Sequence, residues 1–361
     1  MSRFLSNRHK DLSAYVPGEQ PRGLEYIKLN TNESPYPPSP GVIASVTEDE
    51  LAKLRLYPDP DGSVLIQKIA VRYNVKPDNI IIGNGSDELL AFSFLAFCDK
   101  RRRVVFPDIT YGFYPVYAEL FGLAYEQIPL NDDFSVDPAD YVNCGRNVVL
   151  ANPNAPTGIA LPLGDIEEIT RSNPDHVVII DEAYVDFGAQ SAIGLLPRYE
   201  NLLVIHTYSK SRSMAGARLS YAIGSERIVE DLNTMKYSFN PYNVNRLTQV
   251  MGAAAIEDEA YYAARRSEIA KTRGYTAGRL KELGFTMTDS KANFIFAAYP
   301  RLGGHDLYAA LKEKGILVRH FEKPRISDYI RITIGTKEQM DALISAITEI
   351  CGKVAGNHAN R

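Results

Sequence analysis

The stretch VVIIDEAY, residues 177–184, carries the strongest local signal for the fold of this chain. Four consecutive β-branched residues precede two acidic residues. A continuous run of this kind is typical of a strand that is buried on both faces of a parallel sheet. Because Asp181 directly follows the run, its carboxylate is expected to lie in poor solvent and to need a cationic partner. The alternative for Asp181 is a helix N-cap.

Apolar runs of the same kind recur along the chain, with helical patterns between them. They are NIII (79–82), VVF (104–106), VVLAN (148–152) and LLVIHT (202–207), and helices are expected at 87–97 and at about 113–121. Strands that alternate with helices predict a doubly wound, mostly parallel sheet with helices on both faces. We therefore expect an α/β fold whose large domain spans residues 45–265.

The order of elements changes after about residue 265. The expected elements are a helix at 266–283, NFIFAAY (293–299), a helix at 304–314, ILVRHF (316–321), YIRITIG (329–335) and a helix at 337–352. This mixture predicts a smaller α+β domain over residues 266–361. The start of the chain is rich in proline, which disfavours helix. We expect residues 1–44 to form an N-terminal arm that is part of the small domain.

Composition and charge exclude several classes of function. The chain has 361 residues, 40 basic and 44 acidic side chains and a net charge of −4, so no overall attraction for nucleic acid is expected. No apolar stretch approaches the roughly 20 residues of a membrane span. The three cysteines include no CxxC pair, which argues against a disulfide framework or a structural zinc site. We expect a cytoplasmic protein that acts on small molecules.

Ligands of an open parallel sheet bind beyond the carboxyl ends of its strands. NIII is followed by Gly85, Ser86 and Asp87 at the start of a helix, where backbone N–H groups can cradle a phosphate. A plain Ser86 N-cap is the alternative. LLVIHT is followed by Tyr208, Ser209 and Lys210, so Lys210 is a candidate nucleophilic amine. A solvated surface lysine is the alternative reading of Lys210 alone.

The combination of these groups is more informative than any one of them. A lysine, a carboxylate, a tyrosine and a phosphate cradle all follow strands of one predicted sheet. This is the set that pyridoxal phosphate requires, because the amine binds the cofactor and a carboxylate keeps the ring nitrogen protonated. Hydroxyls, amides and an arginine would bind the phosphate dianion.

Several motifs in order resemble the class I/II, fold-type I aminotransferases. They are NAPTG (154–158), DEAY (181–184), SK (209–210) and Arg218. Further segments are similar to histidinol-phosphate aminotransferases over nearly the whole chain. These segments are LNTNESPYPPSP (29–40), LYPDPDG (56–62), GNGSDELL (83–90), PDITYGFYPVYAE (107–119) and DYIRITIGT (328–336).

The resemblance implies pyridoxal 5'-phosphate as cofactor and assigns roles around it. Lys210 would bind the cofactor and move protons, Asp181 would pair with the ring nitrogen, and Tyr184 would donate to the ring oxygen. Tyr111 would stack on the ring. The phosphate would be held by Gly85, Ser86, Asp87, Thr207, Ser209 and Arg218. The asparagine that usually precedes PTG is replaced here by Ala155. The alternatives for its contact are Asn154, Asn152 or Tyr184 alone, and we place Asn154 in the site.

The resemblance also implies a homodimer with shared active sites, because Tyr57 resembles a tyrosine that reaches the cofactor phosphate of the neighbouring subunit. Arg331 matches an arginine that binds a substrate carboxylate. Alternation in YIRITIG also places Arg331 opposite the apolar face of its strand. Arg319, Tyr15, Asn32 and Tyr242 complete the expected substrate side.

The implied reaction moves an amino group between L-histidinol phosphate and 2-oxoglutarate in histidine biosynthesis. The alternatives that keep the cofactor are a threonine-phosphate decarboxylase and an aromatic amino-acid aminotransferase. A non-enzymatic regulatory domain that binds the cofactor is a third alternative. It would require a helix-turn-helix appendage, and the arm is too short and too rich in proline to form one.

Overall fold

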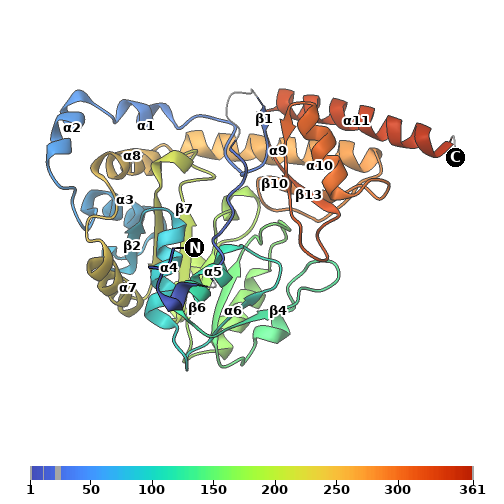
Figure 1. Cartoon of the computed structure of the whole chain (residues 1–361). Coiled ribbons are helices and arrows are strands. Elements are labelled where there is room, and N and C mark those ends of the chain that lie inside the picture. The colour runs from blue at the N-terminus through green and yellow to red at the C-terminus, as the bar shows by residue number, and fades with distance from the viewer. Residues whose placement is uncertain (1, 11, 21–25, 360–361) are drawn as a thin grey trace.

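The computed structural model describes residues 2–10, 12–20 and 26–359. The predicted N-terminal arm includes residues 1, 11 and 21–25, and the predicted small domain includes 360 and 361. These nine positions lie outside the described residues. The described chain forms a large central sheet with helices on both faces, next to a smaller sheet covered by long helices (Figure 1).

The large sheet has seven strands in the order β2-β8-β7-β6-β5-β3-β4. Five neighbouring strands, β7 to β4 in that order, run parallel, whereas β8 is antiparallel to both β7 and β2. The strands are β2 (Ile80–Gly83), β3 (Val104–Pro107), β4 (Tyr125–Ile128), β5 (Asn147–Ala151), β6 (Val178–Asp181), β7 (Leu202–Thr207) and β8 (Ser220–Gly224). The mostly parallel doubly wound sheet is thus confirmed, although the sequence did not predict β4 and β8.

Each face of this sheet packs on its own set of helices. Alternate strand residues such as Val178 and Ile180 pack with α3, α6 and α8, whereas Ile179 packs on the opposite side with α4, α5 and α7. The helices are α3 (Ser63–Tyr73), α4 (Ser86–Phe97), α5 (Phe113–Phe121), α6 (Leu163–Ser172), α7 (Glu226–Phe239) and α8 (Arg246–Glu257). Burial on both faces explains why these strands are continuous β-branched runs.

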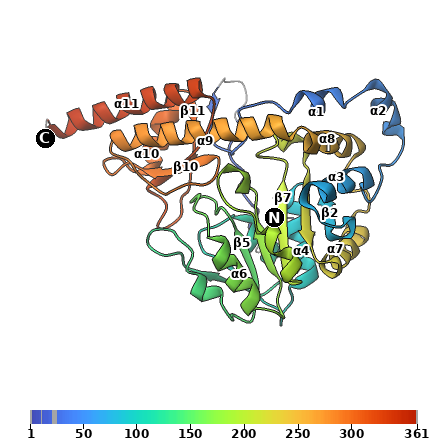
Figure 2. The same ribbon diagram turned by 180° about the vertical axis from the view of Figure 1, so that it is seen from behind.

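A second sheet of four antiparallel strands has the order β12-β13-β10-β9. Its strands are β9 (Thr286–Met287), β10 (Phe294–Ala298), β12 (Arg319–His320) and β13 (Tyr329–Thr333). Three helices supply its core, namely α9 (Glu259–Glu282), α10 (Gly304–Glu313) and α11 (Lys337–Ala359). Helix α9 begins before the expected residue 266 and extends from the helices of the large sheet to the small sheet (Figure 2).

The predicted single strand ILVRHF is divided between two sheets. Its first half, β11 (Ile316–Leu317), pairs in parallel with β1 (Ile27–Lys28) from the N-terminal region. Its second half is β12, which pairs with β13. The chain therefore changes sheet at Val318, and the N-terminal segment is hydrogen-bonded to the C-terminal part. We keep the division into an arm at 1–44, a large domain at 45–265 and a small domain at 266–361 as a proposal.

The remaining elements are short. They are α1 (Pro40–Ala44), α2 (Glu48–Ala52) and the 3-10 turns Asn7–His9, Lys53–Arg55, Pro77–Asn79, Pro138–Tyr141, Val185–Phe187, Ala192–Arg198 and Ala215–Ala217. Within the residues that the structure describes, no helix is both long and apolar enough to cross a bilayer.

Candidate active site

The carboxyl ends of β6 and β7 bring the predicted site residues together. Asp181 is the last residue of β6 and Thr207 is the last residue of β7, and the two strands are direct neighbours. The chain after β7 carries Ser209 and Lys210, and the chain after β6 carries Tyr184. Parallel pairing of adjacent strands is what places these side chains at one edge of the sheet.

Asp181 is buried, with only 4% of its surface exposed. The Tyr114 hydroxyl donates a hydrogen bond to its Oδ2 at 3.0 Å, and the Ala183 N–H donates to its Oδ1 at 3.3 Å. Burial raises the pKa of Asp181 to about 6, because desolvation outweighs both hydrogen bonds. The helix N-cap alternative is wrong, because no helix begins at Asp181. The site is suited to a cationic group that stabilises this carboxylate.

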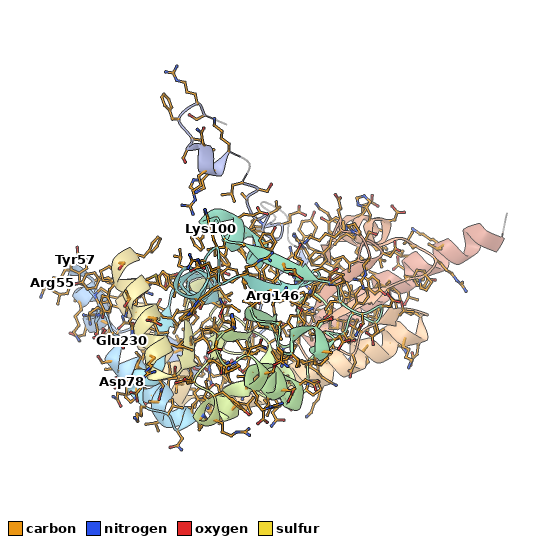
Figure 3. The ribbon with its side chains drawn as sticks, turned by 90° about the horizontal axis from the view of Figure 1, so that it is seen from below. Arg55, Tyr57, Asp78, Lys100, Arg146 and Glu230 are labelled. Carbon is orange, nitrogen blue, oxygen red and sulfur yellow. The ribbon has the colours of Figure 1, made fainter. Side chains whose placement is uncertain are left out.

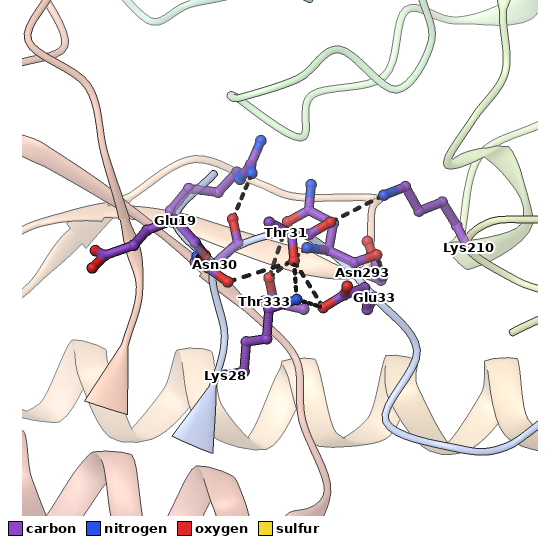
Figure 4. Close-up of polar contacts among 10 residues, drawn as sticks. Glu19, Lys28, Asn30, Thr31, Glu33, Lys210, Asn293 and Thr333 are labelled. Carbon is purple, nitrogen blue, oxygen red and sulfur yellow. Dashed lines mark hydrogen bonds and ion pairs between the residues drawn. The ribbon is translucent and has the colours of Figure 1, made fainter. Parts of the chain in front are cut away.

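Lys210 extends from the loop after β7 toward the N-terminal segment. Its Nζ donates a hydrogen bond to the Thr31 carbonyl oxygen at 3.1 Å (Figure 4). The same Nζ lies 5.8 Å from the centroid of the Tyr184 ring. The surface alternative for Lys210 is therefore wrong, because the side chain lines an internal cavity. Among the described residues the only hydrogen-bond partner of this amine is a neutral carbonyl, which leaves the amine available for chemistry.

The start of α4 forms the predicted cradle. Gly85 has a φ of +78°, and a Cβ built on it would lie 2.2 Å from Nη2 of Arg218. Arg218 Nη2 donates to Asp87 Oδ2 at 2.9 Å, so the guanidinium sits directly against the backbone at Gly85. Only glycine allows both the positive φ and this close approach. The N-cap of α4 is Gly85 and not Ser86, which leaves the Ser86 hydroxyl outside the capping role.

These groups surround a cavity of about 370 Å³, which we call the inner cavity. Its wall includes the side chains expected to bind a cofactor, namely Ser86, Asp87, Tyr111, Asp181, Tyr184, Thr207, Ser209, Lys210 and Arg218. The hydroxyls of Thr207 and Ser209 lie 3.0 Å apart and hydrogen-bond to each other. Tyr111 is held in the wall because its hydroxyl donates to Asp87 Oδ1 at 2.7 Å.

A second cavity of about 490 Å³, the outer cavity, lies beside the first. The two share Thr31, Tyr111, Ala155, Tyr184 and Lys210 in their walls. The outer cavity is lined by the predicted substrate residues Tyr15, Asn32, Arg319 and Arg331, and also by Lys323. Arg319, Lys323 and Arg331 come from the C-terminal part of the chain, whereas Lys210, which also lines this cavity, comes from the loop after β7 of the large sheet.

Arg331 is the most isolated charge of the outer cavity. Its Nη2 donates to the Asn30 carbonyl oxygen at 3.0 Å, and its Nε is buried with no hydrogen-bond partner among the described residues. Burial lowers the pKa of Arg331, because desolvation penalises the charged form. As the alternation predicted, Ile330 and Ile332 point into the core and Arg331 points away from it. An anion in the cavity would satisfy this guanidinium.

A chain of hydrogen bonds fixes the Tyr184 hydroxyl. Asn32 Nδ2 donates to Tyr184 Oη at 2.9 Å, and Thr333 Oγ1 donates to Asn32 Oδ1 at 3.1 Å. Asn32 has a φ of +57°, a conformation that asparagine tolerates better than most residues. Because Tyr184 accepts from Asn32, its own O–H is free to donate into the inner cavity.

Asn154 is not brought into the wall of either cavity. Its side-chain amide donates to the Ile109 carbonyl at 2.9 Å and to Thr157 Oγ1 at 3.2 Å, and it accepts from Thr110 Oγ1 at 2.7 Å. These bonds orient the loop after β5, and it is Ala155 that reaches both cavities. Asn32, from a different part of the chain, is instead the asparagine whose amide contacts the Tyr184 hydroxyl.

Tyr57 and Tyr242 also lie outside the cavities of this chain. Tyr57 is 77% exposed and projects at the periphery of the molecule, near Arg55 (Figure 3). Its ring stacks on that of Tyr242, with centroids 4.6 Å apart. A role for either residue in an active site therefore requires a second chain.

Sequence reasoning missed two residues of the inner site, Tyr114 and Thr31. The spacing of Tyr114, Tyr117 and Ala118 on α5 is typical of a helix face that packs on a sheet, and all three are buried. That pattern predicts burial of Tyr114 but not its bond to Asp181, which lies 67 residues away. Nothing in the local sequence indicates that the Thr31 carbonyl accepts from Lys210.

A family model supports the class of protein that this site indicates. The model described as "Aminotransferase class I and II" matches residues 25–347. The chain belongs to the class I and II aminotransferases. These enzymes use pyridoxal phosphate, which agrees with the lysine, carboxylate, tyrosine and phosphate cradle around the inner cavity.

Curated relatives narrow the family. A histidinol-phosphate aminotransferase of Brachyspira hyodysenteriae is 51% identical over 97% of this chain and 99% of its own. The histidinol-phosphate aminotransferase 2 of Dechloromonas aromatica is 49% identical over 98% of this chain and 100% of its own. Within its class, the chain is a member of the histidinol-phosphate aminotransferase family.

Solved structures support the fold. The histidinol-phosphate aminotransferase of Sinorhizobium meliloti, in complex with pyridoxal-5'-phosphate, has a TM-score of 0.86 and covers 98% of this chain and 100% of its own. The structure from Clostridium acetobutylicum has a TM-score of 0.83 and covers 91% of this chain and 99% of its own. Both are 22% identical to this chain, so the likeness supports the fold.

The residues around the inner cavity fit pyridoxal phosphate. When bound, this cofactor supplies an electron sink for carbanions next to the amino group. The buried Asp181 has no cationic partner in the described part of the chain, and Gly85 leaves room for the Arg218 guanidinium at the start of α4. The protonated ring nitrogen of the cofactor would pair with the Asp181 carboxylate. Its phosphate dianion would bind at the start of α4, next to the Arg218 guanidinium.

Proposed function

We propose that this chain transfers an amino group between L-histidinol phosphate and 2-oxoglutarate, forming imidazole-acetol phosphate and glutamate in histidine biosynthesis. The names of the full-length curated relatives support this reaction. The observation that carries it is Arg331, a partly buried guanidinium that opens into the outer cavity, with an enclosed Nε and no acidic partner among the described residues. A buried charge of this kind needs a counter-ion, which an anionic substrate supplies.

The charge of the outer cavity fits both substrates of this reaction. Histidinol phosphate carries a phosphate, and 2-oxoglutarate carries two carboxylates. Arg331, Arg319 and Lys323 line the cavity, and guanidinium groups bind carboxylates and phosphates through paired hydrogen bonds. Arg319 holds only long contacts of 3.3 and 3.4 Å to the backbone carbonyls of Val16 and Pro17. One anion at a time is therefore bound by a shared set of cations.

We assign the residues of the inner cavity as follows. Lys210 moves the proton between substrate and cofactor, Asp181 holds the positive charge of the ring nitrogen, and Tyr184 donates to the ring oxygen. Tyr111 covers one face of the ring. The phosphate is held by the backbone at Gly85, Ser86 and Asp87 and by the side chains of Thr207, Ser209 and Arg218. Support comes from the shared wall that these groups form.

We also propose a homodimer in which each active site contains residues of both chains. An exposed apolar patch supports it, because contiguous apolar surface marks interaction sites. Tyr57 is 77% exposed and its ring stacks on that of Tyr242, which is also exposed, and Leu54 and Leu56 just before it in the chain are exposed as well. A second copy that covers this patch would bring its Tyr57 toward the cofactor phosphate. A cytoplasmic location remains a prediction, which cell fractionation tests.

The experiment that tests the reaction is a visible absorption spectrum of the purified holoenzyme, titrated with glutamate and then with histidinol phosphate. We expect both compounds to convert the cofactor to its amino form, and 2-oxoglutarate to restore the original spectrum. Histidinol, which lacks the phosphate, is the matched control and is expected to react far more slowly.

Two further compounds separate the proposal from its alternatives. Threonine phosphate tests for a decarboxylase, which would release carbon dioxide without net conversion of the cofactor. Phenylalanine tests for an aromatic aminotransferase. A larger kcat/KM for phenylalanine than for histidinol phosphate, or release of carbon dioxide from threonine phosphate, would contradict the proposed reaction.

A further inference from the structure

A cluster of metal-ligating side chains lies on the small sheet, apart from the two cavities of the active site. It consists of His305, His320 and Glu322, whose potential ligand atoms all lie within 4.8 Å of one another. We propose that these three residues bind a zinc ion. Neither the amino-transfer chemistry nor the cofactor uses any of them.

The fold brings these ligands together from two elements. His305 is the second residue of α10, His320 ends β12, and Glu322 follows two residues later. The helix packs directly on β12, which sets the two histidines opposite each other with ring centroids 5.7 Å apart. Ligands that come from two separate elements depend on tertiary packing and are therefore held in a stable relative position.

The hydrogen bonds of His320 favour a ligand role. Its Nε2 lies 2.8 Å from the carbonyl oxygen of Ser327. A carbonyl can only accept, so Nε2 carries the proton and Nδ1 presents its lone pair. Histidines that bind metals commonly donate their second ring N–H to a carbonyl in this manner, which fixes the ring and the tautomer.

The other two ligands are free to move onto an ion. The side chains of His305 and Glu322 are exposed, and neither forms a hydrogen bond or ion pair with another side chain described in the structure. Tetrahedral zinc with bonds of 2.0–2.2 Å places its ligand atoms about 3.3 Å apart. The ligand atoms lie within 4.8 Å of one another, so they must approach further to bind zinc, and two of the three belong to exposed side chains that can change rotamer.

The surroundings also favour a cation. The three ligands line an open groove of about 470 Å³, which also contains the carboxylates of Asp306 and Asp328. Lys323 is the one basic side chain among its described lining residues, so acidic groups predominate. Two imidazoles and one carboxylate form a donor set that is common in zinc proteins and leaves a fourth position for water.

None of the three proposed ligands lines the outer cavity, although the groove shares Lys323 with that cavity and His320 shares β12 with Arg319. Arg319 and His320 are adjacent in β12, so their side chains point to opposite sides. Arg319 lines the outer cavity and His320 lines the groove. Metal binding can thus be measured on the holoenzyme without occupying the active site.

The test is a titration of the holoenzyme, free of any histidine tag, with zinc chloride in competition with a coloured chelator. The titration is carried out at neutral to mildly alkaline pH, because zinc binds an imidazole only in its neutral form. We expect one zinc ion per chain. His305→Asn and Glu322→Gln are each expected to weaken zinc binding about tenfold or more, as loss of a ligand weakens a site at least as much as loss of its supporting hydrogen bond.

His176→Asn is the matched control, because it removes a histidine elsewhere in the chain. It is expected to leave zinc affinity unchanged, and all three variants are expected to keep the visible band of bound cofactor as evidence of folding. Failure of the parent protein to bind zinc would overturn the proposal. Equal affinity in the parent protein, His305→Asn and Glu322→Gln would also overturn it, because the ion would then be bound elsewhere.

Discussion

The hydroxyl of Tyr114 on α5 donates a hydrogen bond of 3.0 Å to Oδ2 of Asp181 at the end of β6. Both residues are buried, and burial raises the pKa of the tyrosine well above its ordinary value as well as that of the carboxyl. Tyr114 therefore acts as a neutral donor that helps to keep Asp181 ionised in a poor solvent. This relationship makes Tyr114 a positioning residue for the acid that faces the cofactor.

Tyr114→Phe tests that relationship. A hydrogen bond to a charged group contributes about 1.5–3 kcal/mol, so we expect turnover to fall roughly tenfold or more. The pH at which activity begins on the acid side should also rise, because Asp181 becomes harder to ionise. Tyr141→Phe is the control, since the buried Tyr141 hydroxyl has no partner among the described residues. Equal activity profiles for the two variants would contradict the assigned role.

Asp181→Asn is expected to bind cofactor but to lose most of the rate, because an amide cannot stabilise the positive ring nitrogen. A loss of several kcal/mol corresponds to at least a hundredfold decrease in single-turnover rate. The measurement compares single turnovers of the two proteins loaded with cofactor. A decrease of less than tenfold would mean that Asp181 acts only in the structure.

The same substitution has an opposite effect on the stability of the cofactor-free protein. The folded pKa of Asp181 is about 6 and the unfolded value is 3.8, so ionisation of the folded state costs free energy. The cost is absent below pH 3.8, grows between pH 3.8 and 6 and is complete above pH 6. Above pH 6 we expect Asp181→Asn to unfold with about 2–3 kcal/mol more free energy than the parent. Denaturant unfolding of both proteins across this pH range measures the difference in their unfolding free energies. A difference that does not change with pH would show that ionisation of Asp181 is not its cause.

Lys210→Ala is expected to abolish turnover while the fold is retained, because the chain then has no amine at the inner cavity to bond with the cofactor. The parent protein should be trapped covalently by borohydride, whereas the variant should release its cofactor on denaturation after the same treatment. Circular dichroism checks the fold. Normal turnover in the variant would assign the chemistry to another group.

Arg331→Gln is expected to raise the KM for 2-oxoglutarate about tenfold to a hundredfold, as one charge-assisted contact of roughly 1.5–3 kcal/mol is lost. Steady-state kinetics with each substrate in turn provide the measurement. Arg301→Gln is the matched control, because Arg301 is exposed and lies outside both cavities. An unchanged KM in Arg331→Gln would show that the oxo acid is bound by other cations.

The shared active site predicts complementation between two inactive chains. Lys210→Ala and Tyr57→Ala are mixed after each has been shown to be inactive or strongly impaired. One of the two sites in a mixed dimer then receives an intact lysine from one chain and an intact tyrosine from the other, so activity is expected to return in part. No recovery in a mixture that mass measurement shows to contain heterodimers would place Tyr57 in the structure of its own chain.

The sequence by itself determined the central sheet and the residues at its carboxyl edge. Runs such as LLVIHT and the four β-branched residues before Asp181 have one stable environment, a strand buried on both faces, and their order along the chain defines the doubly wound fold. Strand ends then identify Asp181 and Lys210, because the chemistry follows the strand directly. Helix α5 was predicted at its observed bounds for a similar reason, since its apolar spacing is local.

The tertiary structure decided the contacts between distant segments. Because Ala155 stands where the family has an asparagine, the local sequence predicted that the neighbouring Asn154 would replace it. Packing of the N-terminal segment instead brings Asn32 onto Tyr184, which is 152 residues away in the chain. The strand ILVRHF was divided because its two halves found partners in different sheets. Short-range periodicity reports whether a residue is buried, but the partner of a buried polar group depends on how complete elements pack. For that reason the Tyr114–Asp181 hydrogen bond could not be predicted from the sequence and was found only in the tertiary structure.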